Sequence, residues 1–140
     1  MSIFVVGLNH KSAPVEIREK LAFNSNNIPT ALSLFLQRNQ KAEAVILSTC
    51  NRVEIYVSSL DGTVKVDDVF SFLADFHKLE LDTFSPYMYH NKGDRAVHHL
   101  FFVAASLDSM VLGESQILSQ VKEAYTTASV QEATGKVLNQ

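Results

Sequence analysis

The sequence is poor in cysteine, proline, glycine and tryptophan: its 140 residues include one Cys, three Pro, five Gly and no Trp. A single cysteine excludes an internal disulfide and is typical of proteins from reducing compartments. No apolar run approaches the roughly 20 residues that a membrane-spanning helix requires. No basic leader precedes the apolar run at residues 3–6, so a signal peptide is not expected. We therefore expect a cytoplasmic protein with no membrane partner.

An excess of charge of one sign is also missing. The formal net charge is −3, and 19% of the residues are charged. This balance argues against a dominant phosphate-binding surface, although a nucleic-acid partner held elsewhere stays open. Apolar residues make up 46% of the chain, which is ordinary for a globular protein of one domain.

Motifs that hold metals or phosphates are absent from the sequence. There is no Cys-x-x-Cys or His-Glu-x-x-His spacing, so we expect no metal site. The glycines form neither a G-x-G-x-x-G nor a P-loop pattern, so no phosphate-cradling loop is expected; they are Gly7, Gly62, Gly93, Gly113 and Gly135.

The hydrophobic pattern predicts an α+β fold in residues 1–91. Short apolar or alternating runs predict strands, and apolar residues at helical spacing predict helices. Asn24 to Asn27 offer N-cap candidates for one helix, with Pro29 in its first turn. The expected order is a ferredoxin-like β-α-β-β-α-β arrangement with both helices on one face of an antiparallel sheet. The strands are expected at 3–8, 44–47, 53–57 and 87–90, the helices after Asn27 and at 66–77, and a short helical turn at 15–21.

Residues 92–140 read as a helical unit that follows the sheet. A helix is expected from Asp94 to about Ser106, with an apolar stripe formed by Val97, Leu100, Phe101 and Ala104. Helical geometry would then place His99 roughly opposite that stripe, beside Phe102 and Ser106. A second, longer helix is expected at 114–130. The chain stops at Asn139-Gln140 without an obvious closing element.

Cys50 lies in a polar cluster between two predicted strands. The strands would support a tight projecting loop, and functional residues are often found on loops of this kind. Thr49 and Asn51 flank the thiol, and Arg52 is a nearby cation that would favour the thiolate. The alternative is that Cys50 is a small buried hydrophobe, as free cysteines usually are. Both interpretations stay open on the flanking residues alone.

The other candidates also have two interpretations. His99 could carry a proton for Cys50, or it could be a packed or surface histidine. Arg52 could grip a substrate carboxylate through its planar fork, or form a structural salt bridge. A further polar group could line a pocket, or serve as caps and a solvated helix flank: Ser109, Glu114, Gln116 and Gln120.

Three stretches together resemble the glutamyl-tRNA reductase family. Residues 7–19 (GLNHKSAPVEIRE) are similar to the opening of these enzymes, residues 47–56 (LSTCNRVEIY) to their nucleophile loop, and residues 107–118 (LDSMVLGESQIL) to their substrate-recognition segment. The match covers essentially the whole chain.

The resemblance implies a mechanism. Cys50 would attack the ester that joins glutamate to tRNA, giving a glutamyl thioester that NADPH reduces to glutamate-1-semialdehyde for tetrapyrrole synthesis. His99 matches a histidine that is important for activity, and protonating the leaving ribose oxygen suits its chemistry. The substrate-contact positions of the family fall on Thr49, Asn51, Arg52, Ser109, Glu114, Ser115, Gln116 and Gln120. A glutamate substrate suits this set, because Arg52 offers a fork for the carboxylate and Glu114, Ser109 and the glutamines offer acceptors for the ammonium group.

The chain departs from the family in two positions and in length. Ser115 replaces a common proline, and Ser106 replaces a common glycine; neither removes a reacting group. The family continues into an NADPH-binding domain and a helical dimerisation domain, which are absent from this chain. The resemblance therefore implies a catalytic domain whose NADPH and homodimer contacts lie elsewhere, with possible channelling to the semialdehyde aminotransferase. Alone, this domain would act as a slow esterase.

Two rival classes remain. One is a thiol hydrolase that uses Cys50 and His99 without a redox partner. The other is a ligand-binding module with an inert Cys50, which would react slowly with alkylating reagents at neutral pH.

Overall fold

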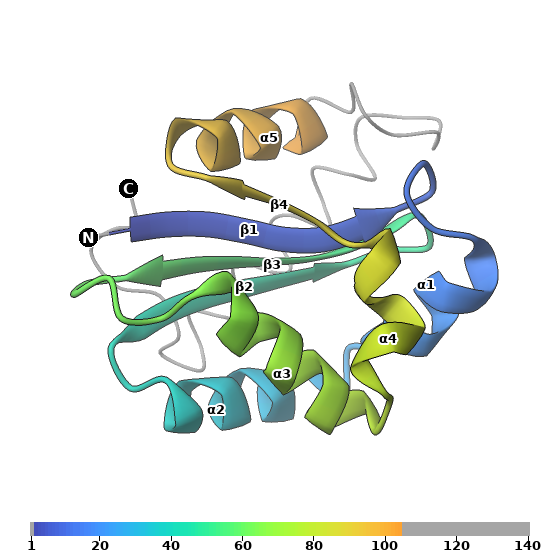
Figure 1. Cartoon of the computed structure of the whole chain (residues 1–140), viewed down its shortest axis with the longest axis horizontal. Coiled ribbons are helices and arrows are strands. Elements are labelled where there is room, and N and C mark those ends of the chain that lie inside the picture. Colours follow the sequence, from blue (N-terminus) through green and yellow to red (C-terminus); the bar gives the residue numbers. More distant parts are fainter. Residues whose placement is uncertain (1, 105–140) are drawn as a thin grey trace.

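The computed structural model describes residues 2–104 of the chain. In this part the strands form a four-stranded antiparallel sheet of order β2-β3-β1-β4 (Figure 1). The predicted α+β class is confirmed. The strands are β1 (Ser2–Asn9), β2 (Ala42–Ser48), β3 (Arg52–Ser59) and β4 (Tyr89–Lys92).

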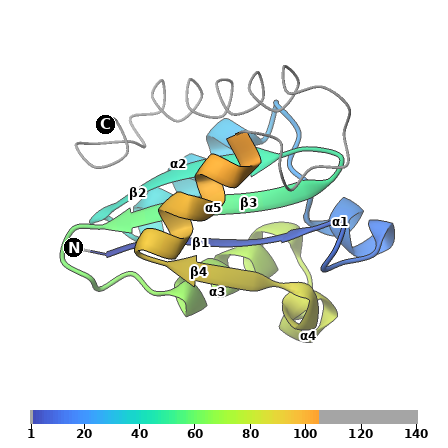
Figure 2. The same cartoon turned by 90° about the horizontal axis from the view of Figure 1, so that it is seen from above.

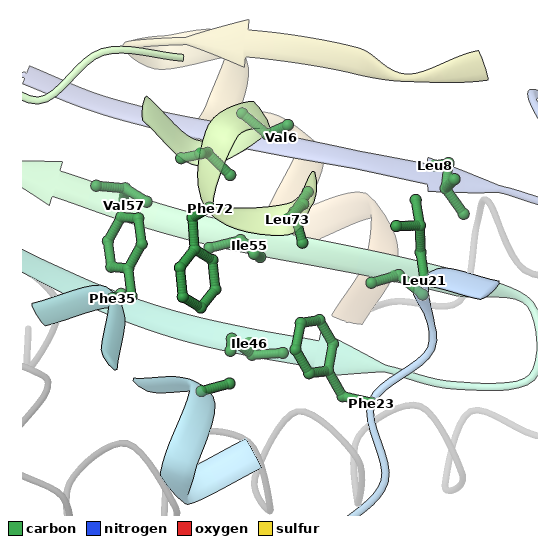
Figure 3. Close-up of a cluster of buried hydrophobic side chains, with 14 of the residues drawn as sticks. Val6, Leu8, Leu21, Phe23, Phe35, Ile46, Ile55, Val57, Phe72 and Leu73 are labelled. Atoms are coloured by element: carbon green, nitrogen blue, oxygen red, sulfur yellow. The ribbon is translucent and has the colours of Figure 1, made fainter. Parts of the chain in front are cut away.

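One face of the sheet carries the main hydrophobic core. Alternate residues of the central strands point to it, including Val6 and Leu8 of β1 and Ile55 and Val57 of β3 (Figure 3). Three helices cover this face: α1 (Val15–Leu21), α2 (Ile28–Arg38) and α3 (Val66–His77). Aromatic side chains join the helices, with the rings of Phe35 and Phe72 edge to face at 5.3 Å.

Local signals explain where these helices begin and end. Pro29 lies in the first turn of α2, where its missing N–H costs nothing. The side chain of Asp68 accepts the backbone N–H of Lys65 at 2.8 Å, which fixes the start of α3. Lys78 ends α3 in the left-handed conformation, with φ of 57°. The predicted bounds of α1 and α3 are confirmed.

The last strand starts later than the sequence indicated. A short helix α4 (Leu81–Phe84) and a 3₁₀ turn η1 (Ser85–Tyr87) lead into β4, so the expected strand at 87–90 is observed at Tyr89–Lys92. Pro86 lies in the 3₁₀ turn, where its fixed φ is favourable.

Helix α5 (Asp94–Ala104) packs on the opposite face of the sheet from α2 and α3 (Figure 1). It crosses the sheet diagonally (Figure 2). Ala96 packs with Val5 and Tyr56 near its start, and Val103 packs with Leu47 near its end. The sheet therefore has helices on both faces within the described residues.

The predicted apolar stripe of α5 is wrong at Val97 and Phe101, whereas Leu100 packs against the sheet as expected. Phe101 is 68% exposed and Val97 is 38% exposed, whereas Ala96 and Val103 are buried. Four consecutive apolar residues from Phe101 to Ala104 let more than one stripe fit the helical period, and the larger side chains suggested the wrong one. The predictions for residues 105–140, including the second helix, lie outside the described residues. Among residues 2–104, no helix is long and apolar enough to cross a membrane.

Candidate functional site

Cys50 lies at the tip of the hairpin that joins β2 and β3. Ser48 and Val53 form the last cross-strand pair, and the Thr49 N–H donates to the Arg52 carbonyl at 2.8 Å. The Thr49 hydroxyl oxygen accepts the backbone N–H groups of Asn51 and Arg52, each at 3.1 Å. These bonds hold the loop in one shape by the Ser/Thr turn mechanism.

The Cys50 side chain is exposed at this tip. A buried cysteine, which the inert alternative required, is therefore not observed. The thiol projects from two paired strands, so a reagent or substrate can reach it without any opening of the core.

A buried carboxylate, Glu54, lies on β3 two residues after Arg52. Its side chain is 0% exposed. One oxygen, Oε1, accepts the hydroxyl of Tyr56 at 2.9 Å. The other, Oε2, accepts the hydroxyl of Tyr89 at 2.5 Å and contacts Nε2 of His99. Oε2 also lies 3.5 Å from Nη1 of Arg52, whose side chain is itself fully buried.

The partners of Glu54 control its ionisation. Burial on its own would raise the pKa of Glu54. The hydrogen bond and charge of His99, the hydrogen bond from Tyr89 and the charge of Arg52 outweigh burial, so the pKa lies below its ordinary value of 4.5. Burial and the negative charge of Glu54 raise the pKa of Tyr56. At neutral pH the cluster thus holds a carboxylate and a neutral phenol.

Gly7 makes room for this cluster. On β1 it pairs with Glu54 on one side and with Tyr89 on the other. A Cβ at position 7 would lie 2.8 Å from Cγ of Glu54 and 2.5 Å from the Val53 carbonyl oxygen. Because Gly7 has no side chain, the Tyr89 hydroxyl reaches across β1 to Glu54.

The sequence-predicted residues fall into three groups. Thr49, Cys50 and Asn51 share the hairpin loop. Arg52 and His99 meet at Glu54, although the predicted stripe had turned His99 away from the core. Helix α5 is rotated relative to that prediction, which brings His99 onto the sheet face beside the Tyr89 ring, with centroids 5.4 Å apart. The remaining candidates lie outside the described residues: Ser109, Glu114, Ser115, Gln116 and Gln120.

Sequence reasoning missed Glu54, Tyr56, Tyr89 and the role of Gly7. The sequence of β3 contained a signal, because side chains that end in a charged or hydroxyl group occupy every second position, at 52, 54 and 56. Alternation of this kind normally indicates a solvent-facing side, and here that side is buried under α5. In the part of the chain that the structure describes, no group of three or more metal-ligating side chains is present.

Comparisons of the sequence and the fold with known proteins identify a family. A family model described as the N-terminal domain of glutamyl-tRNA(Glu) reductase matches residues 6–140. A glutamyl-tRNA reductase of Thermodesulfovibrio yellowstonii is 51% identical over 99% of this chain and 34% of its own length. That of Geotalea uraniireducens is 48% identical over 99% of this chain and 32% of its own length. The solved structure of glutamyl-tRNA reductase from Methanopyrus kandleri aligns with a TM-score of 0.77 and 33% identity, covering 98% of this chain and 30% of that one.

Proposed function

The chain belongs to the glutamyl-tRNA reductase family, and we propose from this premise that it carries the step in which the glutamyl group moves from tRNA to the enzyme. The chain spans about a third of the length of the curated relatives it matches, in the region of the N-terminal domain. The observation that carries the proposal is the exposed thiol of Cys50 at the tip of a hydrogen-bonded hairpin.

The proposed step is a transthioesterification. The Cys50 thiolate attacks the ester carbonyl that joins glutamate to the terminal ribose of tRNA. The bond between carbonyl carbon and ribose oxygen breaks, and its electron pair stays on that oxygen. His99 gives a proton to the oxygen, so that free tRNA leaves and a glutamyl thioester remains on Cys50.

Substrate recognition is assigned to the loop and to the segment that follows α5. Arg52 is a planar cation of the kind that suits a carboxylate, and a substrate carboxylate would compete there with Glu54, against which its side chain is buried. Glu114 and Ser109 are acceptors of the kind that suits an ammonium group. The proposed set is Thr49, Asn51, Arg52, Ser109, Glu114, Ser115, Gln116 and Gln120.

NADPH is the reductant that the resemblance implies, and the described residues do not fit it. A dinucleotide site groups glycines in one turn between a strand and a helix. Gly7 lies inside β1, and Gly62 and Gly93 lie apart in separate turns. We assign no hydride step to residues 2–104, and propose that NADPH and the homodimer contact belong to parts of the longer relatives outside this chain. Reduction to glutamate-1-semialdehyde for tetrapyrrole synthesis, and channelling to the aminotransferase, would depend on those parts.

The fold supports a finer classification. The strand order β2-β3-β1-β4, with every pair antiparallel, fits the ferredoxin-like arrangement. We propose units 1–91 and 92–140 within one catalytic domain, because α5 from the second unit packs directly on the sheet of the first. A cytoplasmic location suits a chain with one cysteine.

The proposal is tested with labelled glutamyl-tRNA and this chain. We expect release of free glutamate and tRNA with or without NADPH, because water hydrolyses a thioester that is not reduced. Cys50→Ser should remove this release and leave the fold intact, since the side chain is exposed and an alcohol gives almost no nucleophile near neutral pH. Release by wild type no faster than by a folded Cys50→Ser variant would contradict the proposal, and aldehyde that depends on NADPH would overturn the division of labour.

A further inference from the structure

The cluster around Glu54 is a costly arrangement for a structural element. Glu54 and Arg52 both have fully buried side chains, yet their closest atoms are 3.5 Å apart. Buried ion pairs with loose geometry rarely repay the cost of removing both charges from water. Apolar side chains at both position 52 and position 54 would avoid this cost, so stability alone does not explain the charged pair.

The hydrogen bonds at Glu54 converge from three separate elements. Tyr56 comes from the same strand, Tyr89 comes from β4 across Gly7, and His99 comes from α5. A carboxylate with both oxygens occupied in this way cannot rotate without breaking several bonds at once. Its position therefore fixes the imidazole that contacts it.

The contact also determines which nitrogen of His99 is bound. Nε2 faces Glu54 Oε2, so a proton on Nε2 is donated to the carboxylate. Nδ1 is then the nitrogen left to exchange protons. A carboxylate against one ring nitrogen holds the tautomer and the orientation of the other, as in hydrolytic triads.

We propose that Glu54 is a positioning residue for His99, which holds the Nε2–H and thereby directs Nδ1 to the proton transfer at the leaving ribose oxygen. This inference rests on the proposed function, because it deepens the role given to His99 there. The proton that reaches the ribose oxygen leaves from Nδ1; the Nε2–H stays on the ring, and Glu54 stays ionised throughout. Tyr56, Tyr89 and Arg52 hold the carboxylate, and Gly7 provides the space for it.

The first test uses the rate at which the chain deacylates glutamyl-tRNA. Glu54→Gln keeps the size of the side chain and removes its charge, and we expect the rate to fall at least about 10- to 100-fold, the loss seen when carboxylate partners of metal-binding histidines are removed. In a His99→Asn background the same substitution should cost nothing further, because Glu54 acts through His99. Phe101→Ala, on the exposed side of α5, is the matched control and should keep the wild-type rate.

Equal slowing by Glu54→Gln in the wild-type and His99→Asn backgrounds would overturn the proposal, and so would an unchanged rate. If Glu54→Gln fails to fold, Tyr89→Phe serves instead. It removes one hydrogen bond from Oε2 and leaves the charge, so we expect a smaller loss of rate that also disappears in the His99→Asn background.

The second test does not depend on turnover. A ring N–H donated to a carboxylate gives a far-downfield proton signal in NMR spectra. We expect this signal in wild type and in Cys50→Ser, and its loss in His99→Asn and Glu54→Gln. If Cys50→Ser deacylates glutamyl-tRNA like wild type, the proposed function is wrong. The NMR signal still shows in that case whether His99 donates its ring N–H to Glu54. A spectrum of Glu54→Gln that retains the signal would overturn the positioning role.

Discussion

At the scale of single residues, Gly7 shows how a missing side chain shapes the site. Gly7→Ala would bring a Cβ within 2.5 Å of the Val53 carbonyl oxygen and 2.8 Å of Glu54 Cγ. We expect a loss of about 1–3 kcal/mol in the free energy of unfolding, as for other overpacked sites. Denaturation by urea measures it.

Gly62→Ala is the control for this substitution. Gly62 has open space around it, and its φ of +73° alone disfavours alanine, by about 1–2 kcal/mol. Gly62→Ala should lower stability and leave the rate of deacylation unchanged. Gly7→Ala should also slow deacylation, because it displaces Glu54. A Gly7→Ala variant that keeps the wild-type rate would show that the carboxylate does not need this space.

Arg52 is a second residue whose chemistry can be tested. Arg52→Lys keeps the charge and loses the planar fork. We expect weaker discrimination between glutamyl and glutaminyl esters of tRNA, measured as the ratio of deacylation rates. Because Arg52 is buried against Glu54, a loss of about 1–3 kcal/mol in stability should accompany it. A Lys variant that selects glutamate as sharply as wild type would leave Arg52 as a structural partner of Glu54 only.

Glu54 also predicts an acid dependence of stability. Its pKa in the folded chain lies below 4.5, so the folded state binds its proton less readily than the unfolded state. The contribution of Glu54 is therefore fully present above about pH 4.5 and is lost as the pH falls through the lower folded pKa. The difference in unfolding free energy between wild type and Glu54→Gln should narrow below pH 4.5.

Asp61 provides a comparison in the same pH range. Its pKa is lowered to about 2, chiefly by the side-chain and backbone hydrogen bonds of Thr63, and it is exposed on a turn. Asp61→Asn should leave the deacylation rate unchanged.

The Glu54 prediction has a clear contrary outcome. A difference in unfolding free energy between wild type and Glu54→Gln that stays constant from neutral pH to pH 3 would contradict an ionised Glu54 that stabilises the fold.

At the scale of elements, helix α5 shows where sequence reasoning stops. Its existence and start were predicted, but its rotation was not, because two apolar stripes fit the same residues and only tertiary packing selects between them. The choice decides whether His99 faces the sheet. We expect Val103→Ala to lower stability by about 1–2 kcal/mol, because two buried methyl groups are lost.

Phe101→Ala is the paired change on the other side of α5. Its ring is 68% exposed, so removing it should change stability by less than about 0.5 kcal/mol. A larger loss from Phe101 than from Val103, measured by urea denaturation, would restore the stripe that the sequence suggested and turn His99 away from Glu54.

The strands were easier to predict than the contacts between them. A continuous apolar run predicted β1 and an alternating run predicted β3, each within two residues at either end. The hairpin at Cys50 followed from the two runs predicted on either side of it. The convergence of Glu54, Tyr89 and His99 could not be predicted, because it depends on the pairing of both β3 and β4 with β1 at Gly7. Residues 35 and 45 positions apart in the sequence meet there.

At the scale of the whole molecule, the two faces of the sheet differ in composition and role. The face under α2 and α3 is apolar and supplies the core. The face under α5 holds the buried polar cluster, and β3, which carries Glu54, also forms the hairpin with Cys50 together with β2. The apolar layer thus supports a site whose proposed reacting groups come from the loop and α5, while β3 and β4 supply the residues that position His99.

The most direct test of the account is to trap the acyl enzyme. The chain is mixed with glutamyl-tRNA, quenched in acid within the first turnover, digested and analysed by mass spectrometry. We expect the peptide with Cys50 to gain one glutamyl group through a bond that neutral hydroxylamine cleaves, and Cys50→Ser to show no such thioester. Glutamate released at the wild-type rate with no adduct on Cys50 at any quench time would contradict it.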